Sequence, residues 1–265
     1  MDASGEMSKP GNSYSILGIQ VAVTSLRAAT ETVVELSEKG SGSYVCAANV
    51  HMCMEAYRDP FFMSVVNGAD LVVPDGKPLF WWMRSFGVVE AEQIRGPDLF
   101  IEVCERASEQ NIPVGFYGGS SQTLELLQAY LKKRWPSLVI SYAVSPPYRE
   151  LTNKEQAEYT RAIKNSGTRI LFVGLGCPKQ ERWMSDNRDR AQSVMIGVGA
   201  AFDFYAGTKK AAPTWMRSVG LEWSYRLLSE PKRLWRRYLT TNPHFMYLFA
   251  KSLIGKYVMS KPRNH

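Results

Sequence analysis

The chain has 265 residues, of which 45% are hydrophobic, and its formal net charge is +7. This length suits one domain with a large core, or a domain with a small appendage, and the composition is not that of a low-complexity chain. No apolar stretch reaches the roughly 20 uninterrupted residues of a membrane-spanning helix.

Residues 1–14 contain Gly, Ser and Pro with no apolar period, which predicts a disordered leader. This segment lacks the basic start and apolar stretch of a secretion signal. The four cysteines have no CxxC spacing, and the three histidines join no metal-ligand pattern. We therefore expect reduced thiols and no metal site.

Strands and helices alternate through the middle of the chain. We expect strands at 44–50, 70–73, 113–117, 139–143, 169–173 and 193–198. We expect helices at 55–67, 78–86, 98–110, 120–134 and 153–166, and a further helix beginning at Pro178. This alternation predicts a Rossmann-like α/β core at 15–207, with a doubly wound, mainly parallel sheet. The nearly all-apolar strands fit a sheet that is covered on both faces.

After about residue 208 the pattern changes to helices only, expected at 215–219, 221–228, 231–239 and 243–259. We interpret residues 208–265 as an α-helical basic appendage. Between Arg226 and Arg237 it carries several basic residues against Glu230 alone. Such a patch suits a diphosphate, a membrane surface or nucleic acid, and a solvated basic helix is the plain alternative. The apolar stretch 245–259 is suited either to a membrane interface or to packing on the core.

Ligands of open parallel sheets bind beyond the carboxyl ends of the strands. The residues expected there are polar or rich in glycine: Asn49, 74–76, 118–120, 174–180 and 199–203. Because a glycine loop before a helix lets phosphate reach backbone amides, Gly118, Gly119 and Ser120 are candidates for nucleotide binding. A simple tight turn is an equal alternative. No Walker A loop and no GxGxxG with an acidic partner occurs, which disfavours ATP hydrolysis and nicotinamide chemistry.

Asp75, in the segment VVPDGKP, follows a short strand, where a carboxylate is placed to act as a general base. These residues alone equally suit an Asp-Gly turn. Arg95 can neutralise phosphate, and Gln180 can hydrogen-bond sugar hydroxyls. Lys179 can contact phosphate or remain solvated, and Asp203 can bind ribose or base, or pair with a lysine.

Seven stretches together resemble the WecG/TagA/CpsF family of bacterial glycosyltransferases, glycosyltransferase family 26. They are ANVHM at 48–52, ADLVVPDGKPL at 69–79, RGPDL at 95–99, VGLGCPKQERW at 173–183, GVGAAFDFYAG at 197–207, APTWMRSVGLEWSYRL at 212–227 and EPKRLWRRY at 230–238. They follow the family's order and cover about residues 15–240.

The resemblance implies an inverting, metal-independent hexosyltransferase without cofactors. Its donor is a UDP-sugar, and its acceptor is a glycan linked to undecaprenyl (polyprenyl) diphosphate. The products feed exopolysaccharide, capsule or wall polymers of the cell envelope. The resemblance also implies that the appendage makes peripheral contact with the inner face of the bacterial plasma membrane, from the cytoplasm, and that membrane association competes with homo-oligomerisation.

By the same resemblance, Asp75 matches the base, and Asn49, Arg95 and Gln180 match pocket residues. Arg226, Arg233 and Arg236 match appendage arginines that close over the site. Gly174, Gly176, Lys179 and Asp203 belong to the matching stretches and are candidates for nucleotide binding. Two positions depart from the family pattern: Ala47 replaces a frequent Thr, and Ala211 replaces a frequent Arg. These departures point to a different donor or acceptor specificity.

Two rival hypotheses stand beside the enzyme. One is a non-catalytic membrane-binding protein that kept the fold. The other is a nucleic-acid-binding module that uses the basic C-terminal segment. The sequence contains no recognised nucleic-acid fold pattern, which argues against this hypothesis. We therefore expect no nucleic-acid partner.

Overall fold

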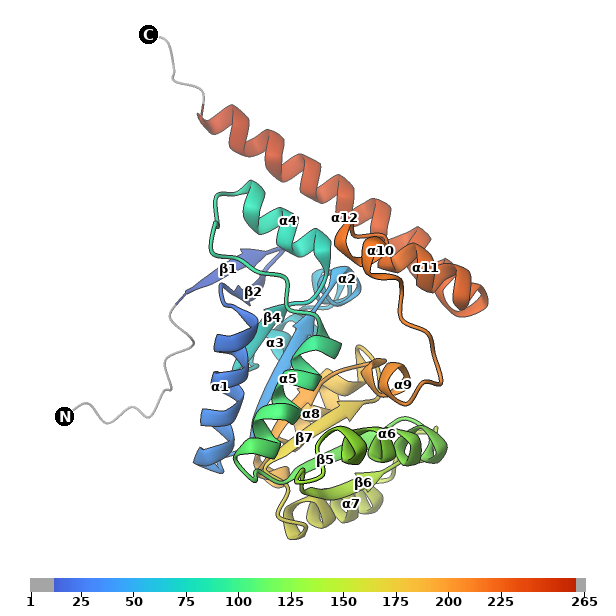
Figure 1. The fold of residues 1–265 in the computed structure, drawn as a ribbon. Helices are drawn as coiled ribbons and strands as arrows, with labels where there is room; N and C mark the ends of the chain where they lie inside the picture. Colours follow the sequence, from blue (N-terminus) through green and yellow to red (C-terminus); the bar gives the residue numbers. More distant parts are fainter. Residues whose placement is uncertain (1–11, 261–265) are drawn as a thin grey trace, which may run out of the picture.

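The structure, a computed structural model, describes residues 12–260 and is built on one six-stranded sheet (Figure 1). The strands lie in the order β4-β3-β8-β7-β5-β6, and each pair is parallel. Their bounds are β3 (Ser43–Ala48), β4 (Leu71–Pro74), β5 (Val114–Gly118), β6 (Ile140–Val144), β7 (Ile170–Gly174) and β8 (Val194–Gly197). The predicted parallel α/β fold is confirmed.

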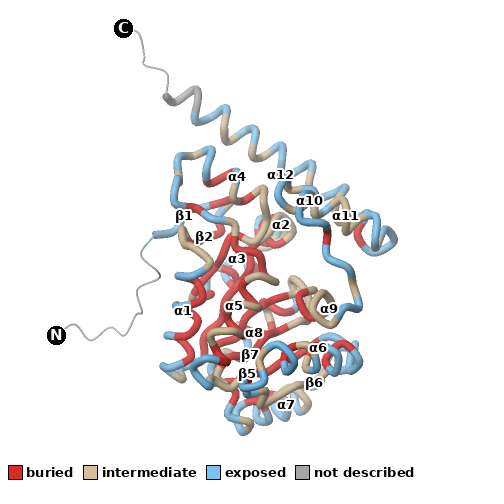
Figure 2. Tube along the Cα trace, in the orientation of Figure 1, coloured by how far each residue is buried: buried red, intermediate tan, exposed pale blue. Residues whose placement is uncertain are grey.

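Helices cover both faces of this sheet, whose strands are mostly buried (Figure 2). One face carries α1 (Leu26–Lys39), α5 (Gly96–Glu109), α6 (Ser121–Arg134) and the short α9 (Ala201–Tyr205). The other carries α2 (Val50–Arg58), α3 (Pro60–Asn67), α7 (Asn153–Asn165) and α8 (Lys179–Ala191). Alternate β3 side chains enter the two cores: Tyr44 and Cys46 on one side and Val45 on the other. This follows the two-residue period of a strand.

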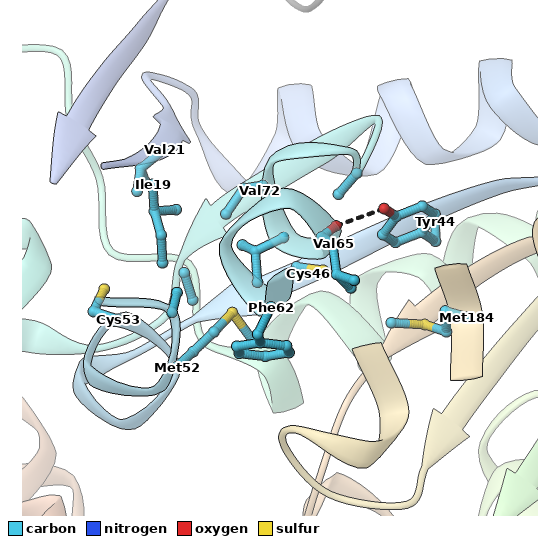
Figure 3. Packing of buried hydrophobic residues seen from close by; sticks show 14 of the residues in the cluster. Ile19, Val21, Tyr44, Cys46, Met52, Cys53, Phe62, Val65, Val72 and Met184 are labelled. Carbon is cyan, nitrogen blue, oxygen red and sulfur yellow. Dashed lines mark hydrogen bonds between the residues drawn. The ribbon is translucent and has the colours of Figure 1, made fainter. Parts of the chain in front are cut away.

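A hydrophobic core packs α2 and α3 against β3, the strand that leads into Asn49 (Figure 3). Met52 of α2 and Phe62 of α3 are buried in the same cluster as Cys46 of β3. The buried Tyr44 hydroxyl donates a hydrogen bond of 2.6 Å to the carbonyl of Val65. Because a buried hydroxyl is costly without a partner, this bond favours one seating of α3 against β3.

The structure differs from the sequence prediction in the N-terminal part of the chain. The single helix expected at 55–67 is divided into α2 and α3, because the Asp59 carboxylate caps α3 by accepting from the amides of Phe61 and Phe62, and Pro60 starts that helix. The hairpin of β1 (Ser13–Ile16) and β2 (Ile19–Ala22) begins inside the predicted leader. The leader prediction is therefore wrong for residues 13 and 14, and its residues 1–11 lie outside the described part.

The remaining helices are α4 (Lys77–Ser85), α10 (Thr214–Ser218), α11 (Glu222–Ser229) and α12 (Pro231–Ser260). The sequence predicts a break before Pro243, but α12 continues through it. An interior proline removes one helical hydrogen bond, and packing offsets that loss. Figure 1 shows α12 lying across α2 and α4. Phe245 and Phe249 lie 5.4 and 5.1 Å from the Trp82 ring, between centroids.

No helix between residues 12 and 260 combines the length and the apolar content needed to cross a membrane.

Phe245→Ala is expected to loosen α12 from α4 and to lower the free energy of unfolding by about 3–5 kcal/mol, the usual cost of emptying a buried phenylalanine site. Phe245 is 1% exposed against the Trp82 ring. Urea denaturation and limited proteolysis of the C-terminal helix measure the effect. Tyr247→Ala is the control, because that ring is 63% exposed on the same helix. Equal denaturation midpoints for the two variants contradict this account of the anchor.

Candidate active site

A cavity of about 990 Å³ lies at the carboxyl edge of the sheet, beneath α10, α11 and α12. Residues that follow β3, β4, β7 and β8 form its floor, as the rule for parallel sheets predicts. Of the predicted site residues, the following line it: Asn49, Asp75, Gly174, Gly176, Lys179, Gln180, Asp203, Arg226 and Arg233.

Asp75 is held at the end of β4 by both its backbone and its side chain. Its amide donates to the carbonyl of Ala48 at 2.8 Å, and its carbonyl accepts from Gln93 Nε2 at 2.8 Å. Carboxylate Oδ1 accepts from the amide of Gly96 at 2.9 Å, and Oδ2 from Asn49 Nδ2 at 3.5 Å. No described residue forms an ion pair with this carboxylate, although it lines the cavity.

Burial, together with the nearby charge of Glu222, raises the pKa of Asp75 to about 6. Hydrogen bonds from Gly96 and Asn49, and the charge of Arg95, oppose this rise in pKa. The carboxylate is therefore ionised at neutral pH and more basic than an exposed aspartate. A general base works best when its pKa lies near the working pH.

Asn49 connects Asp75 to the start of α2. Its Oδ1 caps that helix by accepting from the amide of Met52 at 3.2 Å, which leaves Nδ2 directed at Asp75. The helix cap thus sets the orientation of the amide that faces the carboxylate.

The side chain of Gln180 is buried and forms hydrogen bonds with the loops of the cavity floor. Its Oε1 accepts from the amides of Gly176 at 3.1 Å and Gly199 at 3.3 Å. The oxygen therefore ties the loop after β7 to the loop after β8. Lys179 lies beside it at the cavity, with its ammonium 5.5 Å from the ring centroid of the exposed Tyr148.

Asp203 lines the cavity and also pairs with a lysine, which was the structural alternative for it. Its Oδ2 lies 3.0 Å from Lys209 Nζ. The same ammonium lies 3.5 Å from Glu230, which in turn lies 2.7 Å from Arg233 Nε. This row of charges connects the end of α9 to the start of α12.

The structure places Gly118, Gly119 and Ser120 outside the cavity lining. Gly118 has a φ of +119°, and a Cβ there would lie 2.6 Å from the carbonyl carbon of Gly174. This glycine therefore permits close contact between neighbouring strand ends. Ser120 caps α6 by accepting from the amide of Thr123 at 3.0 Å. These contacts describe a tight turn rather than a phosphate loop open to the cavity.

Comparison with known proteins adds to this geometry. The family model described as "Glycosyl transferase WecG/TagA/CpsF family" matches residues 14–258. The chain belongs to the WecG/TagA/CpsF glycosyltransferase family. It is 31% identical over 204 residues to a Bacillus spizizenii protein, covering 77% of each chain. It is 30% identical over 240 residues to a Staphylococcus aureus MW2 protein, covering 89% of this chain and 92% of the other. Both relatives are named N-acetylglucosaminyldiphosphoundecaprenol N-acetyl-beta-D-mannosaminyltransferase.

Arg95 of this WecG/TagA/CpsF member is buried just outside the cavity lining. Its Nη1 donates to Asp98 at 3.1 Å, and its Nη2 lies 3.2 Å from Glu222 of α11. The guanidinium therefore joins the core to the appendage beside Asp75. Asp98, in the first turn of α5, is thus a partner of this arginine.

Arg236 does not line the cavity. It is exposed on α12 and lies over the ring of Trp235, with its guanidinium carbon 5.3 Å from the ring centroid. The adjacent Arg237 lines the cavity, and its buried Nε has no hydrogen-bond partner in the described part of the chain. The reason is helical phase: Leu234, Thr241 and Phe245 form the buried stripe of α12, and Arg237 falls on that side.

Sequence reasoning missed Glu222, Arg217, His51 and Arg237 as residues of this site. Arg217 lines the cavity with a buried Nε that is unpartnered among residues 12–260. Burial, together with the charge of Arg237, lowers the pKa of His51 to about 4, so this imidazole is neutral. The signal for Arg237 was present in the spacing of apolar residues along 231–245. No comparable signal marks Glu222, whose partner lies far away in sequence.

The glycosyltransferase cavity has more cations than anions. Its lining lysines and arginines are Lys77, Lys179, Lys209, Arg217, Arg226, Arg233 and Arg237, and its acidic residues are Asp75, Asp203, Glu222 and Glu230. No three His, Cys, Asp or Glu side chains come together as a metal site within the described residues.

Proposed function

We propose that this glycosyltransferase moves a hexose from a UDP-sugar to a glycan carried on undecaprenyl diphosphate. The observation that carries the proposal is the partly buried Asp75 carboxylate, free of ion pairs with described residues, in a large cavity rich in arginine and lysine. The relatives' name supports the acceptor class, because it specifies a sugar on diphosphoundecaprenol. Both substrates then carry a diphosphate, which suits a cationic cavity.

The proposed reaction is a direct displacement with inversion. Asp75 removes the proton of the acceptor hydroxyl, whose oxygen attacks the anomeric carbon from the face opposite UDP. The bond between that carbon and the β-phosphate oxygen breaks, and its electron pair leaves with UDP. Arg226, Arg233 and Arg237 stabilise the departing charge, so no divalent metal is needed in this scheme.

We further propose that the enzyme acts as a peripheral protein at the inner face of the bacterial plasma membrane. The exposed residues of the C-terminal helices support this proposal. Large apolar side chains reach solvent there at Trp215, Trp223, Leu228, Trp235, Leu239, Tyr247 and Ile254. Exposed basic residues such as Lys232 and Arg236 lie among them, a combination that favours an anionic lipid surface. The surface of α12 facing away from the core is mostly exposed (Figure 2).

Transfer of labelled sugar tests the proposal. Purified protein is incubated with radiolabelled UDP-glucose, UDP-glucuronate, UDP-GlcNAc or UDP-ManNAc and N-acetylglucosaminyl diphosphoundecaprenol in detergent, without added metal and with EDTA. We expect one donor to give a labelled lipid product, with release of UDP. Absence of product from all four donors, in a protein whose melting temperature UDP does not raise, contradicts the proposal.

A further inference from the structure

A buried carboxylate lies directly behind the cavity floor and takes no part in the chemistry described above. Glu181, in the first turn of α8, is 0% exposed and forms no ion pair with any described residue. Its Oε1 accepts from Gln180 Nε2 at 2.7 Å, and its Oε2 has no hydrogen-bond partner within residues 12–260. Because burying a carboxylate without an ion pair is unfavourable, its presence here requires an explanation beyond packing.

The carboxylate acts on the residue that holds the floor together. Gln180 Oε1 accepts from the amides of both Gly176 and Gly199, which line the cavity with φ values of +81° and +54°. The Gln180 amide also fills the space above Gly197, where a Cβ would lie 2.8 Å from its nitrogen. One side-chain amide therefore sets how two glycine loops approach each other.

A glutamine amide has two orientations of nearly equal shape, with oxygen and nitrogen exchanged. If the Gln180 amide turned over, its NH₂ group would face the two backbone N–H groups, and both bonds would be lost. A carboxylate accepts hydrogen bonds and donates none, so Glu181 selects the orientation that turns NH₂ toward itself and oxygen toward the loops.

We propose that Glu181 is a positioning residue, whose carboxylate locks the Gln180 amide and thereby shapes the Gly176 and Gly199 loops that receive the diphosphate of the donor. The inference rests on the proposed UDP-sugar function for the identity of that ligand. The positioning of the loops can be measured without any ligand.

The surroundings of Glu181 make this lock sensitive to pH. Burial raises its pKa to about 7, and the hydrogen bond from Gln180 opposes this rise. Among the described residues, the thiols of Cys46 on β3 and of Cys177 face it, and burial and the Glu181 charge raise the pKa of both. Protonation lets the carboxyl group donate as well as accept, which weakens its selection of one amide orientation. Donor affinity should therefore fall as the pH drops below about 7.

Glu181→Gln and Glu181→Leu test the lock. In ligand-free protein, hydrogen exchange followed by mass spectrometry should show faster exchange in peptides covering 174–180 and 197–203 for both variants. UDP binding, measured by calorimetry at pH 8, should weaken by about tenfold, the effect of losing a hydrogen bond to a buried group. Between pH 8 and pH 6, UDP affinity should change less in the variants than in the parent protein.

Asn187→Ala is the matched control, because Asn187 is also buried on α8 but donates to the carbonyl of Trp183, away from the cavity. We expect this variant to melt at a lower temperature and to keep normal UDP affinity and normal exchange at both loops. Unchanged loop exchange in both Glu181 variants overturns the positioning role. If the parent protein fails to bind UDP, the proposed donor is wrong, and loop exchange still decides the role of Glu181.

Discussion

Replacing Asp75 with asparagine is expected to lower sugar transfer by about 100- to 10,000-fold, the range that general bases contribute. The asparagine keeps the size of the side chain and can still accept from the Gly96 amide. Only the long 3.5 Å hydrogen bond from Asn49 is lost, because the new NH₂ group faces Asn49 Nδ2, so the cavity keeps its shape. UDP affinity should therefore stay close to that of the parent protein. Initial rates with labelled donor and calorimetric titration with UDP measure the two quantities separately. A variant that retains more than about a tenth of the parent activity removes Asp75 from the role of base.

The pH dependence provides an independent check on Asp75. The pKa of its carboxyl is raised from 3.8 to about 6, so the turnover rate of the parent protein should fall as the pH drops through 6. The residual rate of Asp75→Asn should lack this dependence. The sign for stability is opposite: because the fold favours the protonated form, that contribution to stability is full below pH 3.8 and is lost as the pH rises through about 6. At pH 8 the asparagine variant should therefore melt no lower than the parent protein.

Glu222→Lys is expected to lower transfer by about 100-fold, because it breaks the contact that seats α11 over the active site. Glu222 lies 3.2 Å from the buried guanidinium of Arg95. The next residue in the chain, Gly96, donates a hydrogen bond from its backbone amide to the Asp75 carboxylate. A lysine at position 222 would place a second positive charge beside the buried guanidinium of Arg95. Disrupting a buried ion pair in this way lowers stability by several kcal/mol. Arg226 lies one helical turn further on and would move with α11.

Glu31→Lys is the control for this substitution. It makes the same change of charge in the Arg27–Glu31 pair on α1, whose side chains are 82% and 48% exposed. Exposed pairs of this kind contribute about 0–1 kcal/mol, so activity and melting temperature should hardly change. Transfer rates, melting temperatures and protease sensitivity of the C-terminal helices are compared across the two variants. Normal activity in Glu222→Lys would show that α11 is held by other contacts.

The sheet was predictable because its strands are short apolar runs that each end at glycine, proline or a polar residue. Such runs depend on local sequence, and β7 and β8 match the predicted strands to within one or two residues. Helix ends were less predictable where two capping residues compete. At the start of α7, Thr152 and Asn153 are both residue types that cap helices, and Thr152 takes the cap in a capping box with Glu155.

The floor of the site was also largely predictable, since Asn49, Asp75 and Gln180 follow strands and reach the cavity. The roof of the cavity, which α10, α11 and α12 form, was not predictable, because its geometry depends on how these C-terminal helices pack. The phase of α12 is set by Leu234 and Phe245 against the core, which turns Arg237 inward and Arg236 outward. Contacts between distant segments, such as Arg95 with Glu222, leave no trace in local sequence. The catalytic and binding roles of these residues stay predictions until the variants are measured.

The floor and the roof of the cavity come from different parts of the chain, which affects when catalytic activity can arise during synthesis. A chain leaves the ribosome from its N-terminus, so the sheet with Asp75 emerges well before Arg226, Arg233 and Arg237. Until residues 226–237 have emerged, the nascent polypeptide holds the base but not the guanidinium groups of the roof. Activity should therefore arise only after these residues have emerged and packed on the core, and products that terminate before residue 226 should be inert toward both substrates.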